Sequence, residues 1–270
     1  MKGGAMNGIV DFHTHAFPDA LAERAIKALE EEGGIRAHLD GRVSSLLSSM
    51  DIHGIEKSVV CSIATKPSQF DPILKWCKEI QSERIIPFPS FHPGDPDFRA
   101  RISKIRGEGF KGIKFHPYYQ DFAINEEGLF PVYEEICRAN LVVVVHTGFD
   151  IAFPRVQKAD PFKIAEVKKR FPELKLVTTH LGSWEQWEEV EELLMGKPIF
   201  MEISCSLESL DKDRARGIIL NHPRDYVLFG TDSPWTGQGE TLSLLRNLEL
   251  GTEMEGLILR ENAANLLNSV

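Results

Sequence analysis

Short apolar runs and longer amphipathic stretches alternate along almost the whole chain. Most of the runs carry a Gly, His, Asp or Ser near the C-terminal end. Short apolar runs of this kind predict β-strands. The eight runs lie around Ile9–His13, Lys57–Ile63, Ile85–Phe91, Gly112–His116, Val142–His146, Lys175–His180, Ile199–Ser204 and Tyr226–Thr231.

The stretches between the runs have the period of an amphipathic helix, with apolar residues at spacings of three and four. Two such series are Leu129, Val132, Tyr133, Ile136 and Cys137, and Trp184, Trp187, Val190 and Leu194. Parallel strands are usually joined by helices, so the alternation predicts a parallel sheet in an α/β protein. Eight strand–helix units in one chain favour a closed (β/α)8 barrel, the TIM barrel, over an open sheet.

The length of 270 residues falls within the range of one such barrel. No linker rich in Pro, Gly or Ser divides the chain, so we expect a single domain over residues 8–270 after a short leader, residues 1–7. The segment Ala16–Asp40 is the one local excursion. It predicts a helix from Leu21 to Glu31 and a Gly-Gly turn over the barrel mouth.

Composition argues against several classes of protein. The net charge is −9 and no Lys/Arg run marks a footprint for a phosphate backbone, which argues against nucleic-acid binding. The longest wholly apolar run, Leu141–Val145, is too short to cross a membrane. The four cysteines form no C-x-x-C pair, and the Gly-rich leader does not resemble a secretory signal. We therefore expect a cytoplasmic protein with a small-molecule substrate, and a homodimer is possible.

Candidate metal ligands end several of the predicted strands, where the active site of a barrel lies. The first run ends in His-Thr-His, and its His13 and His15 share a face because alternate strand residues do. The fifth, sixth and eighth runs end at His146, His180 and Asp232. Any one of them could be a hydrogen-bonded core residue or a helix cap. Together they predict a site of imidazole and carboxylate that suits Zn²⁺, Mn²⁺ or Fe²⁺.

The fourth run adds two polar residues to the predicted barrel interior. Within Gly112–His116, Lys114 and His116 share one face, and the apolar residues between them suit the helix-packing side. Lys114 and His116 should therefore point inward and line the substrate pocket. A structural pairing of Lys114 with an acid, either Asp11 or Glu202, is the alternative.

Other residues near the strand ends allow two interpretations each. Glu202 and Ser204 share a face of the seventh run, and a buried carboxylate needs a partner, so Glu202 should join the polar network. Trp235 could form a wall of the pocket or pack in its loop. Arg155 could bind a substrate carboxylate or stay exposed to solvent. Cys205 fits a partly buried structural thiol better than a catalytic nucleophile.

Several of these segments resemble the motifs of the amidohydrolase superfamily. The similarity is stronger to the amidohydrolase-related branch that includes aminocarboxymuconate-semialdehyde decarboxylase, and it spans nearly the whole chain. The segments that carry it are Asp11–His15, Gly112–Pro117, His146–Gly148, His180–Gly182, Phe229–Pro234 and the closing stretch Glu261–Leu267.

The resemblance implies a role for each of the strand-end residues. His13, His15 and His146 would be metal ligands. Asp232 would complete the ligand set and could take a proton from the metal-bound water, as a catalytic base. His180 would be either a ligand of a second metal ion or a catalytic acid that polarises the substrate. Divalent metals lower the pKa of bound water to about 7, so these roles agree with the chemistry.

Ion number and reaction class stay open at this point. In binuclear members of the superfamily a carboxylated Lys at the position of Lys114 bridges two metal ions, whereas the branch that this chain resembles often holds one. We expect one ion, most naturally zinc. The leading function is hydrolysis of a small amide, ester or lactone. The alternatives are non-oxidative decarboxylation of an unsaturated or aromatic carboxylic acid and metal binding without catalysis.

Overall fold

The computed structural model describes residues 8–270, so the predicted leader lies outside the described part of the chain. Each predicted run overlaps a β-strand, and most strands end before the last residue of the run. All of the strand pairs are parallel. The strands are β1 Ile9–Thr14, β2 Ile55–Cys61, β3 Ile85–Phe88, β4 Gly112–Phe115, β5 Val142–Val145, β6 Lys175–Thr178, β7 Phe200–Glu202 and β8 Val227–Leu228.

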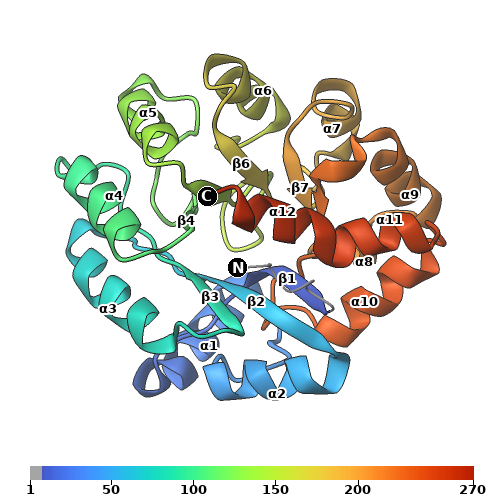
Figure 1. The fold of residues 1–270 in the computed structure, drawn as a ribbon, viewed down its shortest axis with the longest axis horizontal. Coiled ribbons are helices and arrows are strands. Elements are labelled where there is room, and N and C mark those ends of the chain that lie inside the picture. The colour runs from blue at the N-terminus through green and yellow to red at the C-terminus, as the bar shows by residue number, and fades with distance from the viewer. Residues whose placement is uncertain (1–7) are drawn as a thin grey trace.

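The strands close into the predicted (β/α)8 barrel (Figure 1). β1, β2 and β3 form one hydrogen-bonded ladder, and β4 to β8 form another. Backbone bonds outside the ladders join them on both sides. Lys114 N–H donates to the carbonyl of Pro89 (3.1 Å) between β4 and the end of β3. Phe12 N–H donates to the carbonyl of Phe229 (2.8 Å) between β1 and the end of β8.

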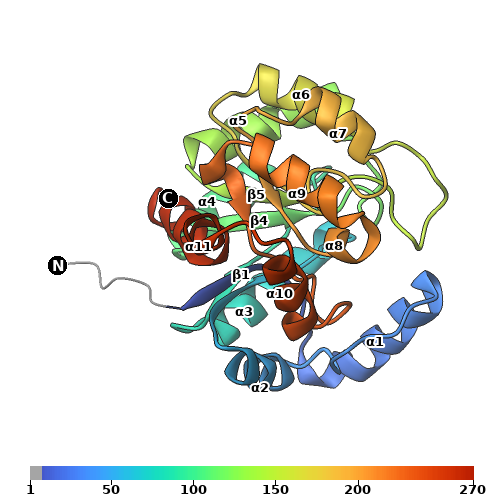
Figure 2. The same ribbon diagram turned by 90° about the vertical axis from the view of Figure 1, so that its right-hand side faces the viewer.

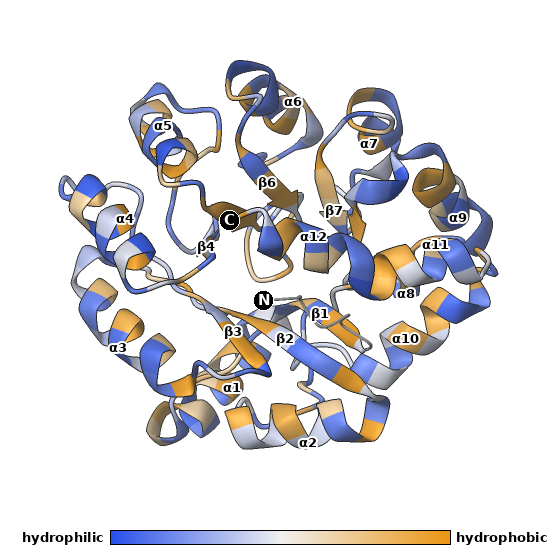
Figure 3. Cartoon of the chain, viewed as in Figure 1, coloured by the Kyte–Doolittle hydropathy of each residue, from blue (hydrophilic) through white to orange (hydrophobic). Residues whose placement is uncertain are grey.

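Helices surround the barrel and bury their apolar faces against it, as Figure 3 shows by the hydrophobic residues on their inner sides. In α3, for example, Phe70, Leu74 and Cys77 are buried. The helices are α1 Asp19–Gly33, α2 Val43–His53, α3 Phe70–Ile80, α4 Phe98–Gly107, α5 Phe130–Arg138, α6 Pro161–Arg170, α7 Trp187–Leu193, α8 Ser206–Ser209, α9 Lys212–Asn221, α10 Gln238–Asn247, α11 Thr252–Gly256 and α12 Asn262–Asn268. In the described chain, no helix is both long and apolar enough to span a bilayer.

Helix α12 covers one end of the barrel (Figure 1). Its Ala263 and Leu266 belong to the same buried cluster as Val10, Phe12 and Val144 of the barrel strands. This apolar cluster fills the end of the barrel where the strands begin. The polar strand-end residues therefore lie at the opposite end, where barrel enzymes carry their active sites.

Two local predictions can be compared directly with the structure. The helix expected in the first excursion is confirmed as α1, which ends where Gly34 adopts a left-handed φ of 62°. The series that begins at Trp184 was expected to be helical from its first residue, but α7 begins only at Trp187. Trp184 instead pairs with the loop after β5, because its backbone N–H donates to the carbonyl of Thr147 (2.9 Å). Figure 2 shows that α1 and the loop after β5 extend toward the same side of the molecule.

Candidate metal centre

The first two predicted ligands point into the barrel because β1 is irregular. Strict strand alternation would place Phe12 and His13 on opposite faces. The pairing of β1 with β2 shifts register between Asp11 and Thr14, as at a β-bulge. Phe12 therefore packs in the barrel core while His13 also turns inward. The result agrees with the prediction that His13 and His15 converge, since their Nε2 atoms lie 3.1 Å apart.

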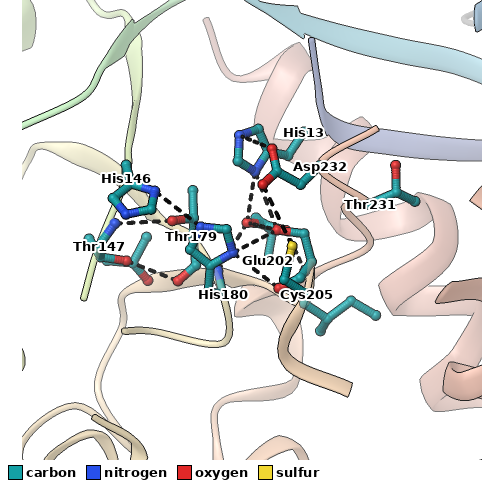
Figure 4. A network of polar contacts seen from close by, with 12 residues as sticks. His13, His146, Thr147, Thr179, His180, Glu202, Cys205, Thr231 and Asp232 are labelled. Carbon is teal, nitrogen blue, oxygen red and sulfur yellow. Dashed lines mark hydrogen bonds and ion pairs between the residues drawn. The ribbon is translucent and has the colours of Figure 1, made fainter. Parts of the chain in front are cut away.

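The loop after β8 brings Asp232 to the same point (Figure 4). Asp232 N–H donates to the carbonyl of His13 (2.7 Å), and His15 N–H donates to the carbonyl of Ser233 (2.5 Å). Asp232 Oδ1 then lies 3.3 Å from His13 Nε2 and 3.1 Å from His15 Nε2. We call His13, His15 and Asp232 the primary group, because their donor atoms lie within 4.8 Å of one another.

The donors of the primary group fit a divalent cation. His13 Nδ1 faces a carboxylate oxygen of Glu202 (3.0 Å), and His15 Nδ1 faces the carbonyl of Cys61 (2.8 Å). These partners only accept hydrogen bonds, so each Nδ1 carries the proton and each Nε2 presents a lone pair. Two nitrogens bound at about 2.1 Å to one ion lie roughly 3.0 to 3.4 Å apart. The two Nε2 lone pairs and the Asp232 carboxylate thus have the spacing and charge of a metal-ligand set.

Glu202 orients the ring of His13 and is itself held from several sides. It accepts bonds from the backbone N–H of His180 (3.0 Å), the backbone N–H of Ser204 (2.7 Å) and the hydroxyl of Ser204 (2.8 Å). Burial acts to raise the pKa of Glu202, but His13, His180 and these bonds outweigh it and hold the pKa below its usual value. The prediction that Glu202 points inward into a polar network is confirmed.

Lys114 is fully buried, as predicted for an inward-facing residue of β4. Its Nζ lies 2.9 Å from His13 Nε2. Lys114 does not form the alternative pairing with Asp11 or Glu202. Burial and then the positive charge of Lys114 lower the pKa of His13 to about 4, so His13 is neutral at physiological pH. Carboxylation of Lys114 stays a prediction.

His146 and His180 form a second facing pair. His146 Nδ1 lies 3.1 Å from His180 Nε2. The other ring nitrogens face carbonyl oxygens, those of Phe149 (3.2 Å) and Ser204 (3.1 Å). Burial first, and then the neighbouring His116 and His180, hold the pKa of His146 well below its usual value. His146 therefore lies beside the primary group without belonging to it, and its role as a ligand stays a prediction.

Asp150 is a polar residue of this region that sequence reasoning missed. It follows β5 in the loop, and its Oδ2 lies 3.3 Å from His116 Nε2 and 3.7 Å from His146 Nε2. The rings of His116 and His146 stack with centroids 4.2 Å apart. His116 is buried, as predicted, and its Nδ1 has no hydrogen-bond partner among the described residues. The sequence signal that could have identified Asp150 is an acidic residue four positions after His146.

Arg155 and Trp235, the other predicted substrate contacts, lie farther out. The guanidinium of Arg155 is 63% exposed, pairs with Glu185 (2.6 Å) and lies over the ring of Phe149. Trp235 is half-buried, and its backbone N–H closes the turn onto the carbonyl of Asp232 (2.9 Å). The charge of Arg155 is therefore already compensated by Glu185.

Comparison with known proteins places this geometry in a family. A family model described as Amidohydrolase matches residues 10–268. The chain belongs to this amidohydrolase family. No curated protein matches the sequence. The family is metal-dependent, and the groups of His and Asp in this amidohydrolase could hold a metal ion.

Solved structures with low sequence identity share the barrel of this amidohydrolase. An uncharacterised TIM-barrel protein from Bordetella bronchiseptica has a TM-score of 0.79 at 20% identity, with 97% of this chain and 98% of that chain covered. A dihydroxybenzoic acid decarboxylase from Polaromonas with bound manganese has 0.71 at 14%, covering 97% of each chain. A protein assigned as a 2-pyrone-4,6-dicarboxylic acid hydrolase from Pseudomonas putida has 0.67 at 14%, covering 97% and 98%.

Proposed function

We propose that this amidohydrolase is a metal-dependent hydrolase that uses metal-activated water on a small amide, ester or lactone. The observation that carries the proposal is the convergence of two unprotonated ring nitrogens, His13 Nε2 and His15 Nε2, on the Asp232 carboxylate. We assign the primary group to the resident ion, with His146 as a further ligand. Zinc fits this donor set, as do manganese and iron.

Asp232 has the properties of a general base. Burial acts to raise its pKa, but His13, His15 and His180 outweigh it and hold the pKa well below its usual value, so Asp232 is ionised at neutral pH. Its buried Oδ1 accepts no conventional hydrogen bond from the described residues and can take a proton. A divalent ion bound beside it would supply Lewis acidity and lower the pKa of a coordinated water to about 7.

His180 is the group that we expect to act on the substrate carbonyl. Its Nδ1–H is held by the carbonyl of Ser204, so Nε2 is the atom that can take up a proton or a metal ion. A protonated Nε2 would stabilise negative charge on the carbonyl oxygen and then protonate the leaving group. Lys114 and His116, which line the same space, would contact the substrate.

The charges around the centre favour hydrolysis over decarboxylation. A decarboxylase needs a cation for the substrate carboxylate. Arg155 is exposed and paired with Glu185, and Lys114 contacts His13. Arg155 is therefore compensated, and Lys114 is the one of these two cations that could reach a substrate. Decarboxylation of an unsaturated or aromatic carboxylic acid is the second candidate, because a manganese-containing decarboxylase shares the barrel.

An assay of the metal-loaded protein separates the two functions. We expect hydrolysis of some members of a panel of lactones, esters and amides, and no release of CO2 from aromatic carboxylic acids. Asp232→Asn should lower the hydrolytic rate by at least about 100-fold, the usual contribution of a general base. Asp225→Asn is the control and should leave the rate unchanged, because Asp225 is exposed and precedes β8, at the end of the strand opposite Asp232. Release of CO2 without hydrolysis would contradict the proposal.

A further inference from the structure

We infer that Asn262 and the π-helical turn Leu257–Glu261 position the metal centre, because they hold the strand that leads to Asp232. The turn joins α11 to α12 (Figure 1). Asn262 belongs to the closing stretch that resembles the family motif, and this stretch supplies none of the proposed ligands. The inference rests on the proposed function only in assigning Asp232 to the ion.

Strand β8 is short for the task of holding a ligand. It consists of Val227 and Leu228, which pair with Met201 and Glu202 of β7. The chain then leaves the ladder and reaches Asp232 four residues later. A metal ligand has to be held close to its productive position by the residues around it. Contacts outside the ladder must therefore fix this segment.

The side chain of Asn262 holds the start of β8. Its Nδ2 donates to the carbonyls of Arg224 (2.8 Å) and Val227 (2.8 Å). Asn262 is buried, and its Oδ1 has no hydrogen-bond partner among the described residues. A side-chain amide offers two N–H donors and one acceptor. Asn262 uses both donors on the backbone around β8 and leaves its acceptor unused.

The π-helical turn holds the other end of β8. In an α-helix the backbone N–H of Asn262 would donate to the carbonyl of Ile258, four residues earlier. Here it donates to the carbonyl of Leu257, five residues earlier. The carbonyl of Ile258 is thus released from that bond, and it accepts the backbone N–H of Phe229 (3.0 Å). Single π-helical turns within α-helices are frequent at functional sites.

Phe229 connects this helix to the primary group. Its carbonyl accepts the backbone N–H of Phe12 (2.8 Å), the residue before His13. Three residues beyond Phe229, the backbone N–H of Asp232 donates to the carbonyl of His13 (2.7 Å). The segment from Phe229 to Asp232 is therefore bonded to β1 at both of its ends. A displacement of Phe229 would move Asp232 relative to His13.

Amide hydrogen exchange in the metal-free, full-length protein tests the inference with Asn262→Ala. The substitution removes the donor from the buried carbonyl of Val227, so β8 should open more often. We expect the amide of Asp232 to exchange at least about 10-fold faster relative to that of Ser58, a buried amide of β2 that donates to the carbonyl of Arg84 (2.9 Å). The affinity for Zn²⁺, measured with a competing chelator, should also fall at least about 10-fold.

Tyr133→Phe is the matched control. The hydroxyl of Tyr133 is buried and donates to the carbonyl of Ile124 (2.8 Å), but it lies on α5 and contacts no part of the β8 segment. This variant also leaves a buried carbonyl without its donor. The relative exchange of the Asp232 amide and the affinity for Zn²⁺ should both stay at the wild-type values.

The outcomes separate this inference from the proposed function. Equal Asp232 exchange in Asn262→Ala and Tyr133→Phe would overturn the inference, as would equal zinc affinity. A protein without hydrolytic activity would contradict the proposed function alone, because neither readout depends on turnover.

If Asn262→Ala does not fold, the wild-type protein supplies the test. Coupling between two sites is reciprocal, so Zn²⁺ should slow exchange of the Phe229 amide at least several-fold more than exchange of the Ser58 amide. Equal slowing of the two amides would contradict the inference.

Discussion

At the scale of single residues, the centre depends on which nitrogen of each ring carries a proton. His13 and His15 could be recognised in the sequence from their spacing alone. Their partners could not, because one is a carboxylate on a distant strand and the other is the backbone carbonyl of Cys61. Glu202 could be assigned to the interior by strand parity, but its contact with His13 depends on how β1 and β7 sit across the barrel.

The orienting role of Glu202 gives a prediction at this scale. Glu202→Gln keeps the shape of the side chain but loses the charge that fixes the Nδ1–H of His13. Residues that hydrogen-bond a metal-ligating histidine usually contribute 10- to 100-fold to metal affinity. We therefore expect the affinity for Zn²⁺ to fall by about 10- to 100-fold. A competing chelator measures the affinity. Glu188→Gln, whose side chain is 86% exposed, is the control. Unchanged zinc affinity in a folded Glu202→Gln protein would show that Glu202 does not orient His13 for metal binding.

At the scale of elements, the primary group forms where β1 runs beside the segment that follows β8. The buried carboxylate of Asp11 joins them, since it accepts bonds from the Thr231 hydroxyl (2.7 Å) and the Gln238 side chain (2.8 Å). Burial raises the pKa of Asp11 to about 7 despite these bonds. The sequence indicated that the ends of β1 and β8 would meet, because every strand of a barrel ends at the same rim. It could not show the bulge in β1 that turns His13 inward.

Gly230, just after β8, allows this arrangement and supplies a prediction at the element scale. A Cβ on Gly230 would lie 2.2 Å from Glu202 Oε2 and 2.9 Å from its Cδ. Gly230→Ala should therefore push Glu202 away from His13 and weaken Zn²⁺ binding, as Glu202→Gln does. Overpacking of this kind should also lower the free energy of unfolding by about 1–3 kcal/mol. Urea unfolding and the chelator competition measure the two effects.

The matched control for that substitution is Gly217→Ala in α9, where an added Cβ meets no atom within 4 Å. Alanine in a helix is favoured over glycine by roughly 0.5–1 kcal/mol, so this variant should be neutral or slightly more stable. If Gly230→Ala binds zinc as tightly as Gly217→Ala does, the close packing of β8 against Glu202 does not position the ligand.

At the scale of the whole molecule, the fold and the location of the site follow from local patterns. Apolar runs and helical periodicity are read within a few residues, and eight repeats suffice to predict the barrel. The details around Asp150 and Cys205 could not be predicted, because they depend on how the loops after β5 and β7 turn. Positive φ angles at Gly148 and Cys205 (89° and 56°) help to set these turns, and sequence patterns do not specify them.

The size of the apolar core explains why the fold should not depend on the metal ion. The buried apolar residues form two large clusters, one between the strands and the surrounding helices and one inside the barrel beneath α12. A chain of this size buries about 75% of its surface on folding, so the core stabilises it without a metal. Removal of the ion should therefore leave the circular dichroism spectrum unchanged.

The most direct test of the metal centre is the metal content of protein purified without chelators, compared with that of His13→Ala and Asp232→Asn. We expect at least about one equivalent of zinc, manganese or iron in the wild-type chain and a marked loss in both variants, with the fold retained. A wild-type protein that holds no metal even after incubation with Zn²⁺, Mn²⁺ or Fe²⁺ would contradict the central claim, as would variants that bind metal normally.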